Sequence, residues 1–309
     1  MLSALRGGNL LGFLSQLAYN SGILSKFAYK NNCILEISFI GAGNLATNLA
    51  LALDHAGHHV RQVYSRTMDS ARALANAVGA EPIVRLSKME STADIYVFSV
   101  TDRVLAELIK DLSETVKGKI FVHTAGSVPM NVFASYVNNF GVLYPMQTFS
   151  KTHPIGFADI PCFIEASDPA TKATLIQLAG TISHRVFEMD SNQRRYLHLA
   201  AVFACNFTNH CYSIAAEILS RHQIPFEVML PLIDRTAQKT HLLSPIDSQT
   251  GPAVRFDRNV MDEQRQLLSD PATKEIYDMM SQDIHRYHTL QRERNIGEKS
   301  QVESLDDKQ

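Results

Sequence analysis

The stretch "FIGAGNLA" at residues 39 to 46 constrains the fold of this chain more than any other feature. It follows a short apolar segment, "ILEIS", and opens a segment with helical apolar spacing, "NLATNLALAL". Its glycines permit a tight turn and a close approach of backbone to ligand, and its alanine lets the helix pack closely on the strand. A G-x-G-x-x-A pattern in a strand–turn–helix unit is typical of the pyrophosphate site of a dinucleotide-binding domain.

A pyrophosphate group would lie against the free N–H groups and the positive end of the helix that follows the turn. An ordinary structural turn is the alternative, but the strand and the helix both fall where the dinucleotide pattern requires them. The residues predicted to form this part of a cofactor site are Gly41, Ala42, Gly43, Asn44 and Leu45.

Residues 64 to 67, "YSRT", end the second predicted strand and bear on the choice of cofactor. NAD sites usually carry Asp or Glu here, which binds the ribose hydroxyls, but no acid occurs between Val60 and Thr67. Ser65, Arg66 and Thr67 instead offer hydroxyl donors and a guanidinium, which suit a 2′-phosphate. The pattern favours NADP(H) over NAD(H), and a solvated loop arginine is the alternative.

Strand-like and helix-like segments alternate from Ile34 onwards, which predicts βαβ units and a Rossmann-type parallel sheet of the α/β class. Later segments, at 191 to 220, 225 to 242 and 272 to 288, have helical patterns, and "HRVFEM" is a candidate for one more strand. The sequence therefore predicts an N-terminal extension at 1–35, a Rossmann domain at 36–167, an all-α helical domain at 168–290 and a disordered tail at 291–309.

Composition excludes several classes of partner. The 309 residues are 45% hydrophobic and 19% charged, with a formal net charge of −2, so neither nucleic acid nor an anionic membrane is an expected partner. No apolar run reaches the roughly 18 to 20 residues of a spanning helix. The four cysteines contain no CxxC pair, which indicates a reducing compartment and a cytoplasmic protein.

Two smaller features carry weaker expectations. The first 35 residues contain Arg6, Lys26 and Lys30 but no acid, which suggests either a targeting-like segment or a disordered start. The segment "DHAGHH" contains three histidines but no carboxylate or thiol at useful spacing, so no metal site is expected.

Several runs together closely resemble a bacterial family of NADP oxidoreductases: "FIGAGNLATNLA", "QVYSRT", "HTAGSVPMNVF", "GVLYPMQTFSK", "LHLAAVFACNFTNH" and "TGPAVRFD". Members of this family join a Rossmann-like domain to a helical domain of unknown function, similar to the C-terminal domain of 6-phosphogluconate dehydrogenase. Distant relatives are pyrroline-5-carboxylate reductase, the β-hydroxyacid dehydrogenases and coenzyme F420-dependent NADP reductases. The resemblance covers about residues 36 to 290 and implies NADP(H) binding, a small-molecule substrate in a cleft between the domains and a homodimer.

Further binding residues are expected at the carboxyl ends of later strands, where open α/β sheets place ligands. Val100 and Thr101 would lie beside the cofactor, and His123 would donate to cofactor or substrate unless it is a structural histidine. Gln147 and Thr148 could bind a substrate head group; pyrroline-5-carboxylate reductases carry Met-Pro-Asn nearby, whereas this chain has Pro-Met-Gln. Arg255 would hold a substrate carboxylate or, alternatively, a surface ion pair.

The segment from residue 192 to 219 reads as one long helix that is apolar nearly all round, which predicts burial. At 100° per residue its polar side chains share about 80° of arc and form either a substrate-facing wall or a helix contact. The members of this stripe are His198, Asn206, Asn209 and Ser213.

The proton donor is the open question of the sequence. The β-hydroxyacid dehydrogenases use a lysine in Lys-x-x-x-Asn on the corresponding helix, but this chain has no lysine between Lys172 and Lys239. His198 is the first candidate, because imidazole titrates near neutrality, and Lys239 is the second. Asn206 is the third predicted catalytic residue, as an amide on the same helix as His198. The chain is expected to reduce or oxidise a small polar carbonyl or imine compound. A non-catalytic NADP sensor and a dimeric interaction protein with a vestigial site remain alternatives.

Overall fold

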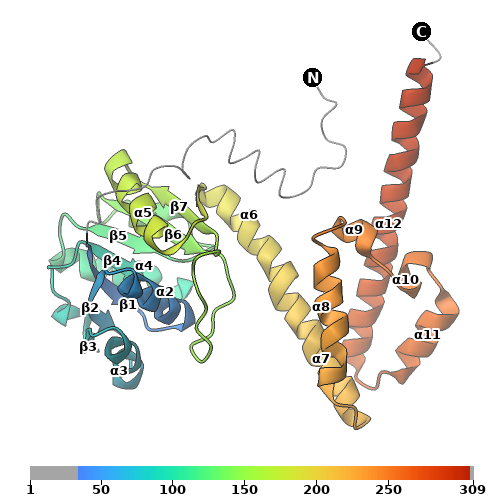
Figure 1. The fold of residues 1–309 in the computed structure, drawn as a ribbon, viewed down its shortest axis with the longest axis horizontal. Coiled ribbons are helices and arrows are strands. Elements are labelled where there is room, and N and C mark those ends of the chain that lie inside the picture. The colour runs from blue at the N-terminus through green and yellow to red at the C-terminus, as the bar shows by residue number, and fades with distance from the viewer. Residues whose placement is uncertain (1–33, 307–309) are drawn as a thin grey trace. The chain divides into compact units, whose positions relative to one another are not determined.

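The computed structural model describes residues 34–306 (Figure 1). The predicted N-terminal extension therefore lies outside the described residues except for its last two positions, and so do residues 307–309 of the predicted tail. The described chain divides into two compact units, one ending at Phe207 and the other beginning at Thr208.

One eight-stranded sheet forms the centre of the first unit, which confirms the predicted Rossmann-type α/β fold. The strands, in spatial order, are β3 (Glu81–Ile83), β2 (His59–Tyr64), β1 (Glu36–Ile40), β4 (Ile95–Phe98), β5 (Ile120–His123), β6 (Phe140–Pro145), β7 (Cys162–Ala166) and β8 (Val186–Glu188). The order reverses at β1, so the carboxyl ends of β1 and β4 flank the position where such sheets bind ligands.

All neighbouring strands are parallel except β6 and β7, which pair antiparallel. The reversal arises because residues 146–161 contain no crossover helix, and a chain without one returns antiparallel to the strand it leaves. β8 falls within "HRVFEM", as predicted.

Helices cover both faces of this sheet. On one face, α2 (Asn44–His55), α3 (Met68–Ala77) and α5 (Pro169–Ile182) contribute buried residues to a core shared with the strands. On the other face, α4 (Asp102–Thr115) packs over an aromatic group, together with the short helices η1 (Leu86–Lys88) and η2 (Met130–Phe133). The rings of that group, Tyr96, Phe98, Phe121 and Phe133, have centroids 5.3 to 6.4 Å apart in their contacting pairs.

The α/β unit extends beyond the domain boundary that the sequence placed at residues 167 and 168. α5 packs on β6 and β7, and β8 pairs with β7, so both elements belong to the sheet. The unit also contains α6 (Ser191–Ala201) and the π-helix η3 (Val202–Phe207). The second unit is entirely helical in its described part: α7 (Thr208–Arg221), η4 (Phe226–Met229), α8 (Leu230–Lys239), α9 (Pro245–Ser248), α10 (Pro252–Arg255), α11 (Arg258–Leu267) and α12 (Pro271–Asp306).

Two further expectations were wrong. Residues 291–306, predicted as disordered, continue α12 as helix, because Gln, Arg, Glu and Lys have high helix propensity and an existing helix needs no new nucleus. The segment predicted as a buried helix exposes large apolar side chains, including Tyr196 at 68% and Phe203 at 62%. Apolar composition all round did not lead to burial within the monomer.

Candidate functional site

The Gly41 turn is built so that no side chain fits at this position. Its φ of +115° lies in the region that favours glycine, and a Cβ there would stand 2.2 Å from the carbonyl oxygen of Ser99. The Gly41 amide donates a 2.8 Å hydrogen bond to the carbonyl of Tyr64. This bond places the end of β2, with "YSRT", directly beside the turn.

Gly43 has a different environment. Its φ of −79° suits any residue, and a Cβ would meet no protein atom within 4 Å. No side chain caps α2, and its first turn contains no acid. The open side of Gly43 and the uncapped helix start therefore fit a pyrophosphate group, which would use the free N–H groups there. Asn44 and Leu45 form this first turn, and buried Ala42 precedes it.

Asn48 fastens α2 to the loop that follows β6. Its side chain is 2% exposed and its amide nitrogen donates to the carbonyls of Asn44 and Ser150, both at 2.9 Å. Its Oδ1 accepts from the amide of Ile155 at 3.2 Å. Through these bonds, the loop carrying Gln147 and Thr148 is held to the helix that begins at the proposed phosphate site. Both of those residues are exposed, and Gln147 accepts from the Thr148 amide at 2.8 Å.

The three residues predicted to recognise a 2′-phosphate lie together between β2 and α3. Arg66 and Thr67 are exposed, whereas Ser65 is half-buried and its amide donates to the carbonyl of Ile83. Within residues 34–306, no carboxylate forms an ion pair with Arg66. The guanidinium is therefore available to an anionic ligand.

Val100 and Thr101 follow β4 as predicted: Val100 is half-buried and Thr101 is the exposed N-cap of α4. For His123, the sequence left a ligand contact and a structural role open. It is fully buried, its ring stacks on Phe133 with centroids 5.5 Å apart, and its Nδ1 accepts from the Ala125 amide. Burial, assisted by the charge of Arg194, lowers the pKa of His123 to about 3. A neutral, enclosed ring favours the alternative of a structural histidine, because a solvent-borne ligand does not reach it.

His198 lies against the carboxyl ends of β5 and β6. Its Nδ1 is 3.0 Å from the hydroxyl of Tyr144, and a Cβ on Gly126 would stand 2.5 Å from the same nitrogen. Tyr144 is 7% exposed, and burial raises the pKa of its hydroxyl despite the opposing effect of Arg194. A half-buried imidazole with one nitrogen bonded to the protein can exchange a proton through the other.

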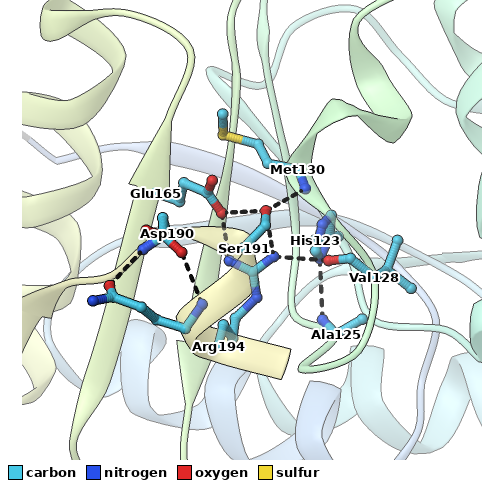
Figure 2. A network of polar contacts seen from close by, with 9 residues as sticks. His123, Ala125, Val128, Met130, Glu165, Asp190, Ser191 and Arg194 are labelled. Carbon is cyan, nitrogen blue, oxygen red and sulfur yellow. Dashed lines mark hydrogen bonds and ion pairs between the residues drawn. The ribbon is translucent and has the colours of Figure 1, made fainter. Parts of the chain in front are cut away.

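An ion-pair network anchors the start of α6, one helical turn before His198 (Figure 2). Arg194 is 1% exposed and donates to Glu165 at 2.5 Å and to the Val128 carbonyl at 2.7 Å. Ser191 donates to Glu165 at 2.7 Å and accepts from the Met130 amide at 2.9 Å. The network ties α6 to β7 and to the loop after β5, so it fixes the helix that carries His198.

The remaining predicted residues are divided between the two units. Asn206 is exposed in η3, in the α/β unit. Asn209 is exposed in α7, Lys239 is half-buried at the end of α8, and Arg255 is exposed at the end of α10. Residues 202–207 form a π-helix, which has more residues per turn than an α-helix. The polar face predicted for His198, Asn206, Asn209 and Ser213 assumed 100° per residue throughout, so these side chains do not share one face as predicted.

Tyr144, Gly126, Glu165 and Arg194 were not identified as site residues from the sequence. Tyr144 and Gly126 lie in the runs "GVLYPMQTFSK" and "HTAGSVPMNVF", at or just after the ends of predicted strands. Because open α/β sheets bind ligands at such strand ends, this position could have identified them. Arg194 gave no signal, because it adjoins Arg195 in a polar run that resembles a solvent-exposed helix start.

Two searches of residues 34–306 complete the description of the site. No three His, Cys, Asp or Glu side chains there are grouped so that they could hold a metal ion. In the same part of the chain, no helix combines the length and apolar character needed to cross a membrane.

Comparison with known proteins assigns the chain to a family. Residues 36–126 match the model described as NADP oxidoreductase, coenzyme F420-dependent, and residues 160–284 match a domain of unknown function, DUF2520. No curated protein matches.

Several solved structures are similar. A reductive aminase from Aspergillus terreus is 13% identical with a TM-score of 0.60, covering 82% of this chain and 94% of its own. An imine reductase from Myxococcus stipitatus is 16% identical with a TM-score of 0.56, covering 82% and 93%. At these identities the likeness shows a shared fold. A Bacteroides fragilis protein described as a "putative NADP oxidoreductase" has a TM-score of 0.80, and the match covers 82% of this chain and 98% of that one. Because 50% of the aligned residues are identical, this chain belongs to the same NADP oxidoreductase family.

Proposed function

We propose that this protein is an NADP(H)-dependent oxidoreductase that transfers hydride to or from a small polar carbonyl or imine compound. The observation that carries the proposal is that two features lie at the same edge of one sheet. An uncapped helix start with an open Gly43 follows the carboxyl end of β1, and the Tyr144–His198 pair lies at the carboxyl end of β6, with β4 and β5 between them. The substrate cleft between the domains, implied by the family resemblance, stays a prediction.

In the proposed reaction, the bound cofactor supplies or accepts the hydride. The turn at Gly41 and Gly43 and the first turn of α2 hold the pyrophosphate, and Arg66 binds the 2′-phosphate. During carbonyl reduction the protonated imidazole of His198 gives its Nε2 proton to the oxygen that becomes the alcohol, and is left neutral. An imine that arrives protonated needs no such transfer, because hydride addition to its carbon yields the amine directly.

The test is an assay of deuterium-labelled NADPH against keto acids and cyclic imines, with products analysed by mass spectrometry. We expect label transfer to at least one compound, and His198→Ala to lower ketone reduction by about 100-fold or more while NADPH affinity is unchanged. No transfer to any compound despite tight NADPH binding would favour the sensor alternative. Absence of NADPH binding would contradict both and leave the interaction protein.

Arg66→Ala should change cofactor preference. Loss of charge-assisted hydrogen bonds to the 2′-phosphate should weaken NADPH by about 10- to 100-fold and leave NADH affinity nearly unaltered. Fluorescence titration with each nucleotide measures both constants. Arg72→Ala, which removes a nearby charge on α3, is the matched control and should alter neither affinity. Equal losses for the two nucleotides with Arg66→Ala would contradict the assignment.

We also propose that the protein is a homodimer. Its helical unit exposes several large apolar residues, among them Leu232, Leu242, Leu267 and Met279, at 59% to 84% of their surface. Several exposed large apolar side chains within one helical unit favour an association surface. Sedimentation velocity at micromolar concentration should give a dimer, and a monomer at all concentrations would contradict the proposal.

A further inference from the structure

The Tyr144–His198 contact raises a question that no family match answers, namely which ring nitrogen of His198 is available to a substrate. Three elements meet at this ring: β6 contributes Tyr144, the loop after β5 contributes Gly126, and α6 contributes His198 itself. Tyr144 and Gly126 both approach Nδ1. Nε2, on the other side of the ring carbon Cε1, takes no part in the bond to Tyr144.

We propose that Tyr144 is a positioning residue that holds Nδ1 of His198 from the protein side, so that Nε2 is the nitrogen presented for proton exchange. The role of Nε2 in catalysis rests on the proposed function. The position of the proton on the neutral His198 ring, however, is a property of the protein without ligand and can be measured there.

The chemistry of a buried phenol supports this role. Burial raises the pKa of Tyr144, so its hydroxyl keeps its proton at neutral pH. A protonated hydroxyl donates to a neutral Nδ1 and, after rotation, accepts from a protonated one. It can therefore stay bonded to the ring in each state. It accepts from Nδ1–H while His198 is protonated and just after Nε2 has given up its proton, and it donates to Nδ1 once exchange with solvent has returned the neutral ring to its resting form. In the neutral ring, a donor at Nδ1 places the remaining proton on Nε2.

Gly126 completes the arrangement from the other side. A Cβ at this position would stand 2.5 Å from Nδ1, 2.6 Å from Cγ and 2.9 Å from Cβ of His198. Only a residue without a side chain lets the imidazole lie against the loop while it reaches Tyr144. T-shaped packing with a centroid separation of 6.0 Å adds a ring contact between Tyr144 and His198, which a phenylalanine at 144 would retain.

The test uses the full-length protein labelled with ¹⁵N-histidine, whose ring nitrogens are observed by long-range proton–nitrogen correlation. His198→Gln assigns the signal. In the wild type at pH 8 we expect His198 to be protonated on Nε2, with Nδ1 as acceptor. Tyr144→Phe should produce a substantial Nδ1-protonated population, because no donor then selects Nε2. Tyr136→Phe removes a partly exposed hydroxyl elsewhere and should leave the His198 signals unchanged.

Gly126→Ala provides a second, independent displacement, since it moves the His198 ring while Tyr144 is intact. It should produce the same tautomer change as Tyr144→Phe. Backbone amide spectra and thermal unfolding establish that each variant is folded. An Nδ1-protonated His198 in the wild type, or a His198 signal that Tyr144→Phe does not alter, would overturn the inference. NADPH titration of the same samples separates this result from failure of the proposed function, which would show as lack of nucleotide binding.

Discussion

Gly43→Ala is expected to weaken NADPH binding by about 100-fold or more, equivalent to about 2.8 kcal/mol, while the fold stays as stable as the wild type. The backbone φ of Gly43, −79°, suits alanine, and no protein atom lies within 4 Å of the added methyl group. The unliganded protein therefore accommodates the substitution. A pyrophosphate bound at the start of α2 would occupy that same space. Fluorescence titration with NADPH and thermal unfolding measure the two effects separately.

Two glycine variants serve as controls for this prediction. Gly41→Ala should destabilise the protein as well as abolish binding, because its Cβ would stand 2.2 Å from the Ser99 oxygen at φ +115°. Gly79 also has a positive φ, +66°, but an added Cβ would have no atom within 4 Å. Gly79→Ala should therefore lower stability slightly. Because position 79 is remote in sequence from the turn, the substitution should leave NADPH binding unchanged. Wild-type NADPH affinity in Gly43→Ala would contradict a pyrophosphate site at this turn.

The features that were predicted correctly depend on residues close together in the sequence. The strand, glycine turn and helix at 36–55 are encoded by local turn chemistry and apolar spacing, and they lie where expected. The same holds for "YSRT": Tyr64 is the last residue of β2, and Thr67 is the N-cap of α3. For His198, its position on α6 was predictable, but its bond to Tyr144 joins residues 54 positions apart.

Features that depend on tertiary contacts could not be predicted in this way. The antiparallel direction of β7 depends on the conformation of a loop without helical or strand periodicity. His123 ends an apolar strand like any strand-end residue, and tertiary packing encloses it: β5 lies between β4 and β6, and Phe133 stacks on its ring. The exposure of Tyr196 and Phe203 follows from what α6 and η3 pack against, which their own composition does not specify.

Arg194→Met should cost the α/β unit about 3 to 5 kcal/mol of stability, the largest folding effect expected of any single change in this site. Arg194 is 1% exposed and Glu165 is 17% exposed, so removing the guanidinium leaves a mostly buried carboxylate without its cation. The Val128 carbonyl loses its donor as well. For a unit of this size the unfolding temperature should fall by about 10 °C. Hydrogen exchange should accelerate first in α6 and β7, the elements that the network joins.

Arg195→Met is the matched control, since this neighbouring arginine is exposed and forms no ion pair with another residue of 34–306. It should change stability by less than about 0.5 kcal/mol. Arg194→Met combined with Glu165→Gln should recover part of the loss, because a neutral amide costs less to bury than a carboxylate and can still accept from Ser191. If Arg194→Met and Arg195→Met are equally stable, the network does not anchor α6, and the placement of His198 must depend on Tyr144 and Gly126 alone.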